Sequence, residues 1–108
     1  MSYQEIDPSQ ALEQMRQTPE LQVVDVREPW EYEKIHIEGV RLIPLGEIEE
    51  RYRELDAAKP VLCVCAGGVR SERAARFLLS QGFSDVTNMA EGMKGWQGQG
   101  LTLDPAQD

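Results

Sequence analysis

The sequence predicts an α/β fold, with a mostly parallel five-stranded sheet that helices cover on both faces. Short apolar runs rich in β-branched residues alternate along the chain with longer segments in which apolar residues recur every three or four positions. This alternation favours parallel pairing, because each helix carries the chain back across the sheet to begin the next strand. In such sheets, ligands bind at the carboxyl ends of the strands.

The first three predicted elements are a strand, a helix and a second strand. We expect residues 3–6 to form a short edge strand. Residues 7–17 are predicted to form a helix, because Asp7 can cap its N-terminus and Pro8 suits its first position. The β-branched run at residues 21–26 is short enough to be a buried strand.

The middle of the chain is predicted to contain a helix, a strand and a further helix. Residues 28–35 are expected to form one short helix with a proline near its start. Residues 40–45 are expected to form a short strand that ends at Pro44 and Gly46. Residues 47–55 combine helix-forming residues with apolar positions spaced four and three apart, which predicts a helix.

The last third of the chain repeats the alternation. Residues 61–65 are the most strand-like stretch, and residues 71–82 are predicted to form an amphipathic helix that a glycine closes at its C-terminus. Residues 84–89 are expected to be the last strand, followed by a short helix or turn at residues 92–99. The tail, residues 101–108, is expected to fray.

The composition predicts one domain over residues 1–108, with its core at about residues 4–100. The chain has 108 residues, of which 41% are hydrophobic and 28% are charged, enough for a single core. A net charge of −8 leaves no overall basic face, so we expect no nucleic acid and no membrane as partner. No apolar run approaches the roughly 20 residues of a membrane span. Because the N-terminus also lacks the pattern of a signal peptide, we expect a cytoplasmic protein.

The cysteines and the histidine do not predict a disulfide or a metal site. Cys63 and Cys65 should point to the same face of their strand, about 6.6 Å apart, which fits a disulfide poorly. His36 is the only histidine in the sequence, so cysteine and histidine alone cannot assemble a convincing zinc site.

The stretch CAGGVRS, at residues 65–71, joins a predicted strand to a predicted helix. Its two glycines can adopt positive φ, so the backbone N–H groups can form an anion-binding nest. The helix N-terminus near Ser71 and the guanidinium of Arg70 add positive charge at the same point. These groups would lower the pKa of the Cys65 thiol. A buried cysteine before an ordinary glycine turn is the alternative, and the residues of this stretch leave both interpretations open.

Three stretches of the chain, taken together, resemble a known family. In order and spacing they resemble the rhodanese (thiosulfate sulfurtransferase) domain: VVDVREPWEYEKIHIEGVRLIPL, VLCVCAGGVRSERAARFLLSQGF and VTNMAEGMKGW. The resemblance covers residues 4–100 and implies a rhodanese-like α/β fold. Its specific parts are Asp25-Val26-Arg27, Glu31-Tyr32, His36-Ile37 with Gly39, Ile43-Pro44, the loop from Cys65 to Arg70, and Glu91-Gly92 with Trp96.

The resemblance implies that Cys65 is the catalytic cysteine, because Arg70 closes the family's six-residue loop C-x-x-x-x-R. By the same resemblance, the Cys65 thiolate takes the outer sulfur of a donor such as thiosulfate, releases sulfite and becomes a persulfide. An acceptor then removes that sulfur: cyanide in assays, and a thiol or a protein cysteine in cells. No metal or organic cofactor is implied. The residues expected to bind substrate and persulfide are Ala66, Gly67, Gly68, Val69, Arg70 and Ser71.

Two other functions stay open beside this thiosulfate sulfurtransferase. The loop is less basic than in many members of the family, since Ala66 and Val69 occupy positions that can carry charge. An uncharged Val69 suits a hydrophobic partner or a protein donor, which would make the chain a persulfide carrier with little thiosulfate activity. A small phosphatase or arsenate reductase is disfavoured, because the related phosphatases use a loop one residue longer, wide enough for phosphate.

Five other residues have preferred structural interpretations. We expect Cys63 to be a small core residue rather than a thiol that resolves a persulfide. We expect His36 to make a fold-stabilising hydrogen bond rather than to act as a general base. Asp25 and Arg27 are expected to tie the end of the second strand to neighbouring loops, and Trp96 is expected to anchor the last helix.

Overall fold

A computed structural model describes residues 2–107 of the chain, and within them the strands form a five-stranded sheet. The strand order is β1-β5-β4-β2-β3, and every pairing is parallel. The predicted α/β fold is therefore confirmed. The strands are β1 (Gln4–Ile6), β2 (Gln22–Asp25), β3 (Arg41–Leu42), β4 (Val61–Val64) and β5 (Val86–Met89).

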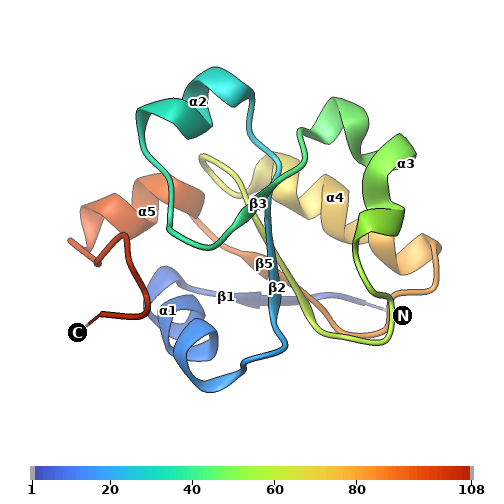
Figure 1. Cartoon of the computed structure of the whole chain (residues 1–108), viewed down its shortest axis with the longest axis horizontal. Helices are drawn as coiled ribbons and strands as arrows, with labels where there is room; N and C mark the ends of the chain where they lie inside the picture. The colour runs from blue at the N-terminus through green and yellow to red at the C-terminus, as the bar shows by residue number, and fades with distance from the viewer. Residues whose placement is uncertain (1, 108) are drawn as a thin grey trace.

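Helices cover both faces of this sheet (Figure 1). Helices α1 (Pro8–Gln17) and α5 (Gly92–Gly98) pack together on one face, whereas α4 (Val69–Ser80) packs against β4 and β5 on the other. Helix α3 (Ile48–Arg51) lies on the α4 side, and α2 (Pro29–Lys34) follows the carboxyl end of β2. None of the helices within residues 2–107 has both the length and the apolar composition that crossing a membrane requires.

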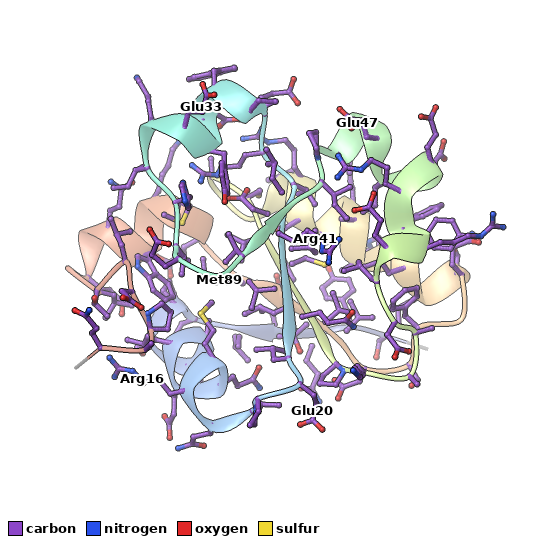
Figure 2. The ribbon with its side chains drawn as sticks, viewed as in Figure 1. Arg16, Glu20, Glu33, Arg41, Glu47 and Met89 are labelled. Atoms are coloured by element: carbon purple, nitrogen blue, oxygen red, sulfur yellow. The ribbon has the colours of Figure 1, made fainter. Side chains whose placement is uncertain are left out.

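The buried core forms two clusters, one on each face of the sheet, and β4 with the residue after it contributes to both. Val61, Cys63 and Cys65 belong to the cluster under α4, whereas Leu62 and Val64 belong to the cluster under α1 and α5. This alternation is expected for a strand that is buried on both faces. In Figure 2 the labelled side chains of Arg16, Glu20, Glu33 and Glu47 lie at the edge of the molecule.

The segment predicted as a helix over residues 47–55 consists of three short pieces instead. A 3-10 turn (η1, Leu45–Glu47), α3 and a second 3-10 turn (η2, Tyr52–Glu54) follow one another. Tertiary contacts hold both ends, since the N–H of Leu45 donates to the carbonyl of Val26 at 3.0 Å and Leu55 is buried in the core. A helix this short has little stability of its own, so these contacts determine the path of the chain.

Strand β3 and helix α4 also differ from their predicted bounds, and strand β5 begins at Val86, two residues later than predicted. Strand β3 covers only part of the predicted range 40–45, because Pro44 has no N–H to donate. Ile43 and Leu45 on either side of this proline still donate to carbonyls at the end of β2 and beyond it. Helix α4 begins at Val69, two residues before its predicted start, and this earlier start changes the geometry of the preceding loop.

The C-terminal residues 101–107 make contacts with the rest of the domain, where the sequence predicted a frayed tail over residues 101–108; Asp108 lies outside the described residues. Leu101 and Leu103 pack against the cluster under α1 and α5. Arg16 of α1 donates two hydrogen bonds to backbone carbonyls of this segment. The local sequence does not reveal these contacts, because the surface that buries both leucines comes from other parts of the chain.

Candidate functional site

Cys65 stands directly after the last residue of β4, at the carboxyl edge of the sheet. Its exposed fraction is 1%, and its carbonyl accepts the N–H of Met93 at 2.8 Å. The next carbonyl, of Ala66, accepts the N–H of Lys94 at 2.9 Å. The loop that begins at Cys65 therefore rests on the first turn of α5.

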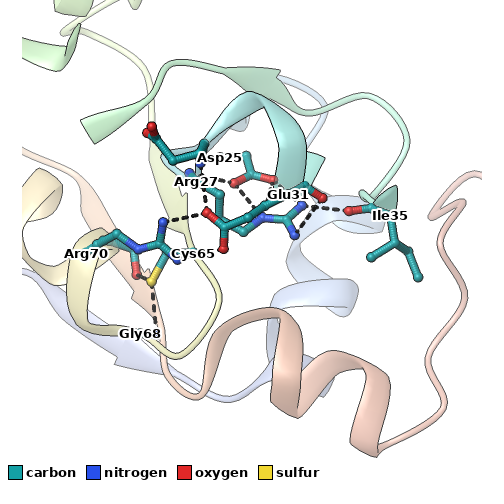
Figure 3. A network of polar contacts seen from close by, with 9 residues as sticks. Asp25, Arg27, Glu31, Ile35, Cys65, Gly68 and Arg70 are labelled. Carbon is teal, nitrogen blue, oxygen red and sulfur yellow. Dashed lines mark hydrogen bonds and ion pairs between the residues drawn. The ribbon is translucent and has the colours of Figure 1, made fainter. Parts of the chain in front are cut away.

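Two polar groups donate hydrogen bonds to the Cys65 sulfur (Figure 3). The N–H of Gly68 lies 3.0 Å from Sγ, and the Ser71 hydroxyl lies 3.2 Å from it. Desolvation of this buried thiol raises its pKa, but hydrogen bonds from Ser71, Gly68 and Gly67 outweigh that effect and lower the pKa of Cys65 below its ordinary value. The loop therefore favours the thiolate, which is the nucleophilic form of cysteine.

Gly68 has a backbone conformation that glycine adopts readily and other residues adopt at a cost. Its φ is +97°, and it caps the N-terminus of α4. A Cβ at this position would come within 3.2 Å of the backbone nitrogen of Glu91. Gly67 has no positive φ, so only one of the two glycines uses the freedom that the sequence suggested.

The early start of α4 places Val69, Arg70 and Ser71 in the first turn of the helix. The first N–H groups of a helix have no acceptor inside it, and the helix dipole is positive at this end. Among the residues predicted to bind substrate, Gly68 and Ser71 thus meet at the Cys65 sulfur. The side chain of Val69 points away into solvent, with an exposed fraction of 69%.

Arg70 does not present an unpaired charge to the loop, contrary to the expectation from the sequence. Its guanidinium forms a bidentate ion pair with Glu31 of α2, with Nη1–Oε1 and Nη2–Oε2 distances of 2.7 and 2.9 Å (Figure 3). Hydrogen bonding to Arg70 holds the pKa of Glu31 at about 2, so the carboxylate stays ionised. Glu31 entered the sequence analysis only through the family resemblance, because no local pattern identifies a partner 39 residues away.

Gly92 is a site residue whose role the sequence analysis missed. Its φ is +56°, and a Cβ there would lie 2.3 Å from the carbonyl oxygen of Cys65 and 2.6 Å from the carbonyl carbon of Ala66. Helix α5 can support the loop only because this position has no side chain. The signal was the pair Glu91-Gly92 just beyond the last strand, which entered only as part of the family resemblance.

Asn88 of β5 is a second missed residue, fully buried beneath the loop. Its Nδ2 donates to the carbonyl of Gly68 at 3.2 Å and to the carboxylate of Glu5 at 2.9 Å. Both of these groups are acceptors, which determines the orientation of the amide. Its Oδ1 has no hydrogen-bond partner among the described residues. Asn88 thus joins β1 and β5 to the start of α4, and the signal was an amide side chain inside a predicted strand.

Asp25, Arg27 and His36 have the structural roles expected of them. Both Asp25 and Arg27 are buried and form an ion pair of 2.8 Å, and Arg27 also donates to the carbonyl of Ile35 at 2.8 Å. The Nδ1 of His36 lies 2.7 Å from the carbonyl oxygen of Tyr32. Because a carbonyl only accepts, this nitrogen carries the hydrogen.

Trp96 and Cys63 also have the expected structural roles. Trp96 is fully buried, and its Nε1 donates to the carbonyl of Thr102 at 3.1 Å, so it anchors α5. Cys63 is fully buried in the core, and desolvation raises the pKa of its thiol to about 12. The two free cysteines therefore differ chemically, since only Cys65 has donors that favour its thiolate.

A surface hollow of about 680 Å³ lies near the amino ends of β2 and β3, away from Cys65. The end of α1, the residues that precede these strands and the C-terminal segment surround it, and its lining contains no cysteine or histidine. The candidate site is therefore the Cys65 loop at the opposite edge of the sheet.

Comparison with known sequences gives matches along most of the chain. The family of the rhodanese-like domain matches residues 8–99. The chain is 49% identical over 79 residues to the "Putative sulfur carrier protein YrkF" of Bacillus subtilis (strain 168), covering 73% of this chain and 43% of YrkF. It is 37% identical over 95 residues to the thiosulfate sulfurtransferase GlpE of Pseudomonas putida, covering 88% of this chain and 86% of GlpE. The chain thus spans less than half of YrkF, and it spans 62% of YqhL, another B. subtilis relative.

Comparison with solved structures also finds a rhodanese-related protein. The crystal structure of a rhodanese-related protein from Thermoplasma volcanium superposes with a TM-score of 0.84 at 29% identity, covering 93% of this chain and 96% of that one. Reduced CoADR-RHD of Bacillus anthracis gives a TM-score of 0.79 at 29% identity, covering 87% of this chain but only 16% of that one.

Proposed function

Because this chain belongs to the family of rhodanese-like domains, we propose that it is a sulfurtransferase that works through a persulfide on Cys65. It moves a sulfane sulfur from thiosulfate or a similar donor to a thiophilic acceptor, which is cyanide, a thiol or a protein cysteine. The observation that carries this proposal is the pair of hydrogen bonds that Gly68 and Ser71 donate to the Cys65 sulfur.

In the first step, the Cys65 thiolate attacks the outer sulfur of the donor. With thiosulfate, the bond between the two sulfur atoms breaks, a new sulfur–sulfur bond to Cys65 forms, and sulfite leaves with the electron pair. The outer sulfur of the persulfide carries a negative charge. The N–H groups between Ala66 and Ser71 stabilise that charge, as backbone donors do for other anionic intermediates.

In the second step, the acceptor attacks the outer sulfur and the Cys65 thiolate leaves. Cyanide becomes thiocyanate, and a thiol becomes a persulfide. The hydrogen bonds that favour the thiolate of Cys65 make it both an available nucleophile and a good leaving group. Neither step needs a general base, a metal or an organic cofactor, so the proposal gives His36 no role beyond its hydrogen bond to Tyr32.

Mass spectrometry of the intact protein, as purified and after incubation with thiosulfate, tests this proposal. We expect a gain of one sulfur atom, which cyanide removes as thiocyanate. The variant Cys65→Ser should not gain the sulfur. The variant Cys63→Ala should gain it, because Cys63 is buried and its pKa is raised. Sulfur uptake that survives in Cys65→Ser, or no uptake from any sulfane donor, would refute the proposal.

A persulfide carrier for a partner protein is the second candidate, and the surface beside the loop favours it. Among the described residues, Trp30 and Val69 are the exposed large hydrophobic side chains, with exposed fractions of 62% and 69%. They directly precede Glu31 and Arg70, which form an ion pair across the site. The similarity to YrkF also supports a carrier. Slow thiocyanate formation from thiosulfate, together with fast sulfur transfer to a protein thiol, would favour this role.

A small phosphatase or arsenate reductase is the least supported alternative, because the loop from Cys65 to Arg70 has six residues rather than seven. Phosphate release from an aryl phosphate that is lost in Cys65→Ser would support it. As part of the main proposal we place the protein in the cytoplasm, where reducing conditions keep free thiols available.

A further inference from the structure

The loop after Cys65 has a single arginine, and an acidic residue of another helix neutralises it. Residues 66–69 are uncharged, and Arg70 pairs with both carboxylate oxygens of Glu31. The Glu31 side chain is only 14% exposed, and its Oε1 also accepts the N–H of Glu28 at 2.9 Å. Because three hydrogen bonds hold this carboxylate, the neutralising charge is a built part of the site.

The ion pair lies beside Cys65 (Figure 3), since Arg70 belongs to the same six-residue loop. Hydrogen bonds to Glu31 are the main reason that the pKa of Arg70 is raised, and the charges of Cys65 and Glu28 raise it further. Lys94, beyond the other side of the loop, is exposed and shares a surface hollow with Glu91. The arginine that closes the loop therefore meets an incoming sulfur donor as one half of an ion pair rather than as a free cation.

We propose that Glu31 selects the sulfur donor by charge, because its neutralisation of Arg70 disfavours dianionic thiosulfate and favours the persulfides of thiols. This inference rests on the proposed function and names the donor class of the same site. Glu31 acts through Arg70 and touches no reacting atom, so it is a residue that determines specificity rather than a catalytic residue.

The selectivity follows from Coulomb's law, because the energy of a dianion near a fixed charge is twice that of a monoanion. Removing one negative charge about 6 Å from the donor, screened as in water (dielectric constant about 80), should favour a dianion by about tenfold and a monoanion by about threefold. The ratio of the rate constants for a dianionic and a monoanionic donor therefore reports the charge at residue 31. The change in this ratio when that charge is removed should decrease as salt is added.

A thiol persulfide meets the chemical requirement with no further reactant. The Cys65 thiolate attacks the outer sulfur of R–S–SH, and the sulfur–sulfur bond of the donor breaks. The thiol R–SH leaves with the proton, and Cys65 keeps the outer sulfur as an anionic persulfide. Charge and oxidation state balance, so neither an oxidant nor a reductant takes part.

Two small sulfane donors separate the effect of charge from that of chemistry. Thiosulfate is a dianion that leaves as sulfite, whereas methanethiosulfonate is a monoanion in which a methyl group replaces one charged oxygen and which leaves as methanesulfinate. The rate constant for sulfur uptake by Cys65, followed by intact mass in a single turnover, is measured for both donors. The test variant is Glu31→Gln. The matched control is Glu33→Gln, which makes the same change in net charge at an exposed position of α2 (Figure 2).

We expect Glu31→Gln to raise the rate constant about tenfold for thiosulfate and about threefold for methanethiosulfonate, and Glu33→Gln to change neither. Arg70→Gln leaves Glu31 unpaired and should slow thiosulfate more than methanethiosulfonate; this variant carries the test if Glu31→Gln does not fold. The double variant restores a neutral pair, so its ratio of rate constants should return close to that of the wild type.

The outcomes distinguish this inference from the function on which it rests. A folded Glu31→Gln protein that takes up sulfur from both donors with the wild-type ratio would overturn charge selection and leave the sulfurtransferase proposal intact. Lower rate constants with both donors would also overturn it, since Glu31 would then hold Arg70 in a productive position. Failure of the wild type to take up sulfur from either donor would overturn the proposed function itself.

Discussion

Replacing Ser71 with alanine should raise the pKa of Cys65, because the variant removes the hydroxyl that lies 3.2 Å from the sulfur. Ser71 is fully buried, so water does not readily replace its hydroxyl, while the N–H of Gly68 at 3.0 Å remains. A hydrogen bond to a charged group contributes about 1.5–3 kcal/mol, and about 1.4 kcal/mol corresponds to one pKa unit. Because sulfur is a weak acceptor, we expect a rise of about one unit, at the low end of this range.

The assay is the rate of alkylation by iodoacetamide as a function of pH, measured by intact mass in a Cys63→Ala background so that a single thiol reacts. The midpoint of the profile gives the pKa of Cys65. Below the midpoint, the Ser71→Ala protein should react about tenfold more slowly, in proportion to its thiolate fraction. The matched control is Ser80→Ala, which removes a hydroxyl from the exposed end of the same helix.

An unchanged or lower midpoint in a folded Ser71→Ala protein would refute the reasoning that hydrogen bonds to the sulfur favour its thiolate. Thermal unfolding separates this result from a loss of structure. Alanine is a better helix former than serine, so the variant should keep helix α4, and a similar shift in Ser80→Ala would point to a general effect rather than to the hydrogen bond.

Two further predictions concern the supports of the loop. Gly92→Ala should destabilise the protein by roughly 2–5 kcal/mol, the sum of the costs of a left-handed backbone and of a clash with the carbonyl of Cys65. The control is Gly98→Ala, whose added Cβ meets no atom within 4 Å. Equal unfolding midpoints of the two variants in denaturant would contradict the clash. The ion pair of Glu31 and Arg70 should stabilise the protein fully above the ordinary Glu31 pKa of 4.5 and lose its effect as pH falls towards about 2. The difference in free energy of unfolding between wild type and Glu31→Gln should therefore vanish at low pH. A difference that persists undiminished at pH 2 would contradict a stabilising role of this ion pair.

Local signals account for the elements that the sequence predicted accurately. Asp7 caps α1 and accepts the N–H of Gln10, and Pro8 is the first residue of the helix, as their residue types indicated. The apolar run before Cys65 forms β4, and the glycines after it form the turn into α4. In each case the interactions join residues a few positions apart, so the information lies in the local pattern.

The segment over residues 45–54 and the C-terminal residues 101–107 were predicted less well, for the same physical reason. The first changes from one helix to three pieces because the carbonyl of Val26 holds its start and the core holds its end. The second packs through Leu101 and Leu103 because α1 and α5 form an apolar surface at that place. Short segments have little intrinsic stability, so their conformation depends on contacts from distant parts of the chain.

By itself, the sequence determined the α/β fold, the position of Cys65 at the end of a strand and the turn that follows it, because periodicity, capping and glycine act over a few residues. Only the tertiary structure decided the electrostatics around that sulfur. Arg70 is paired with Glu31 from α2, and Asn88 and Gly92 support the loop from β5 and α5. Each of these contacts joins residues far apart in the chain, and charge and close packing act through space, so they exist only once the sheet has brought those elements together.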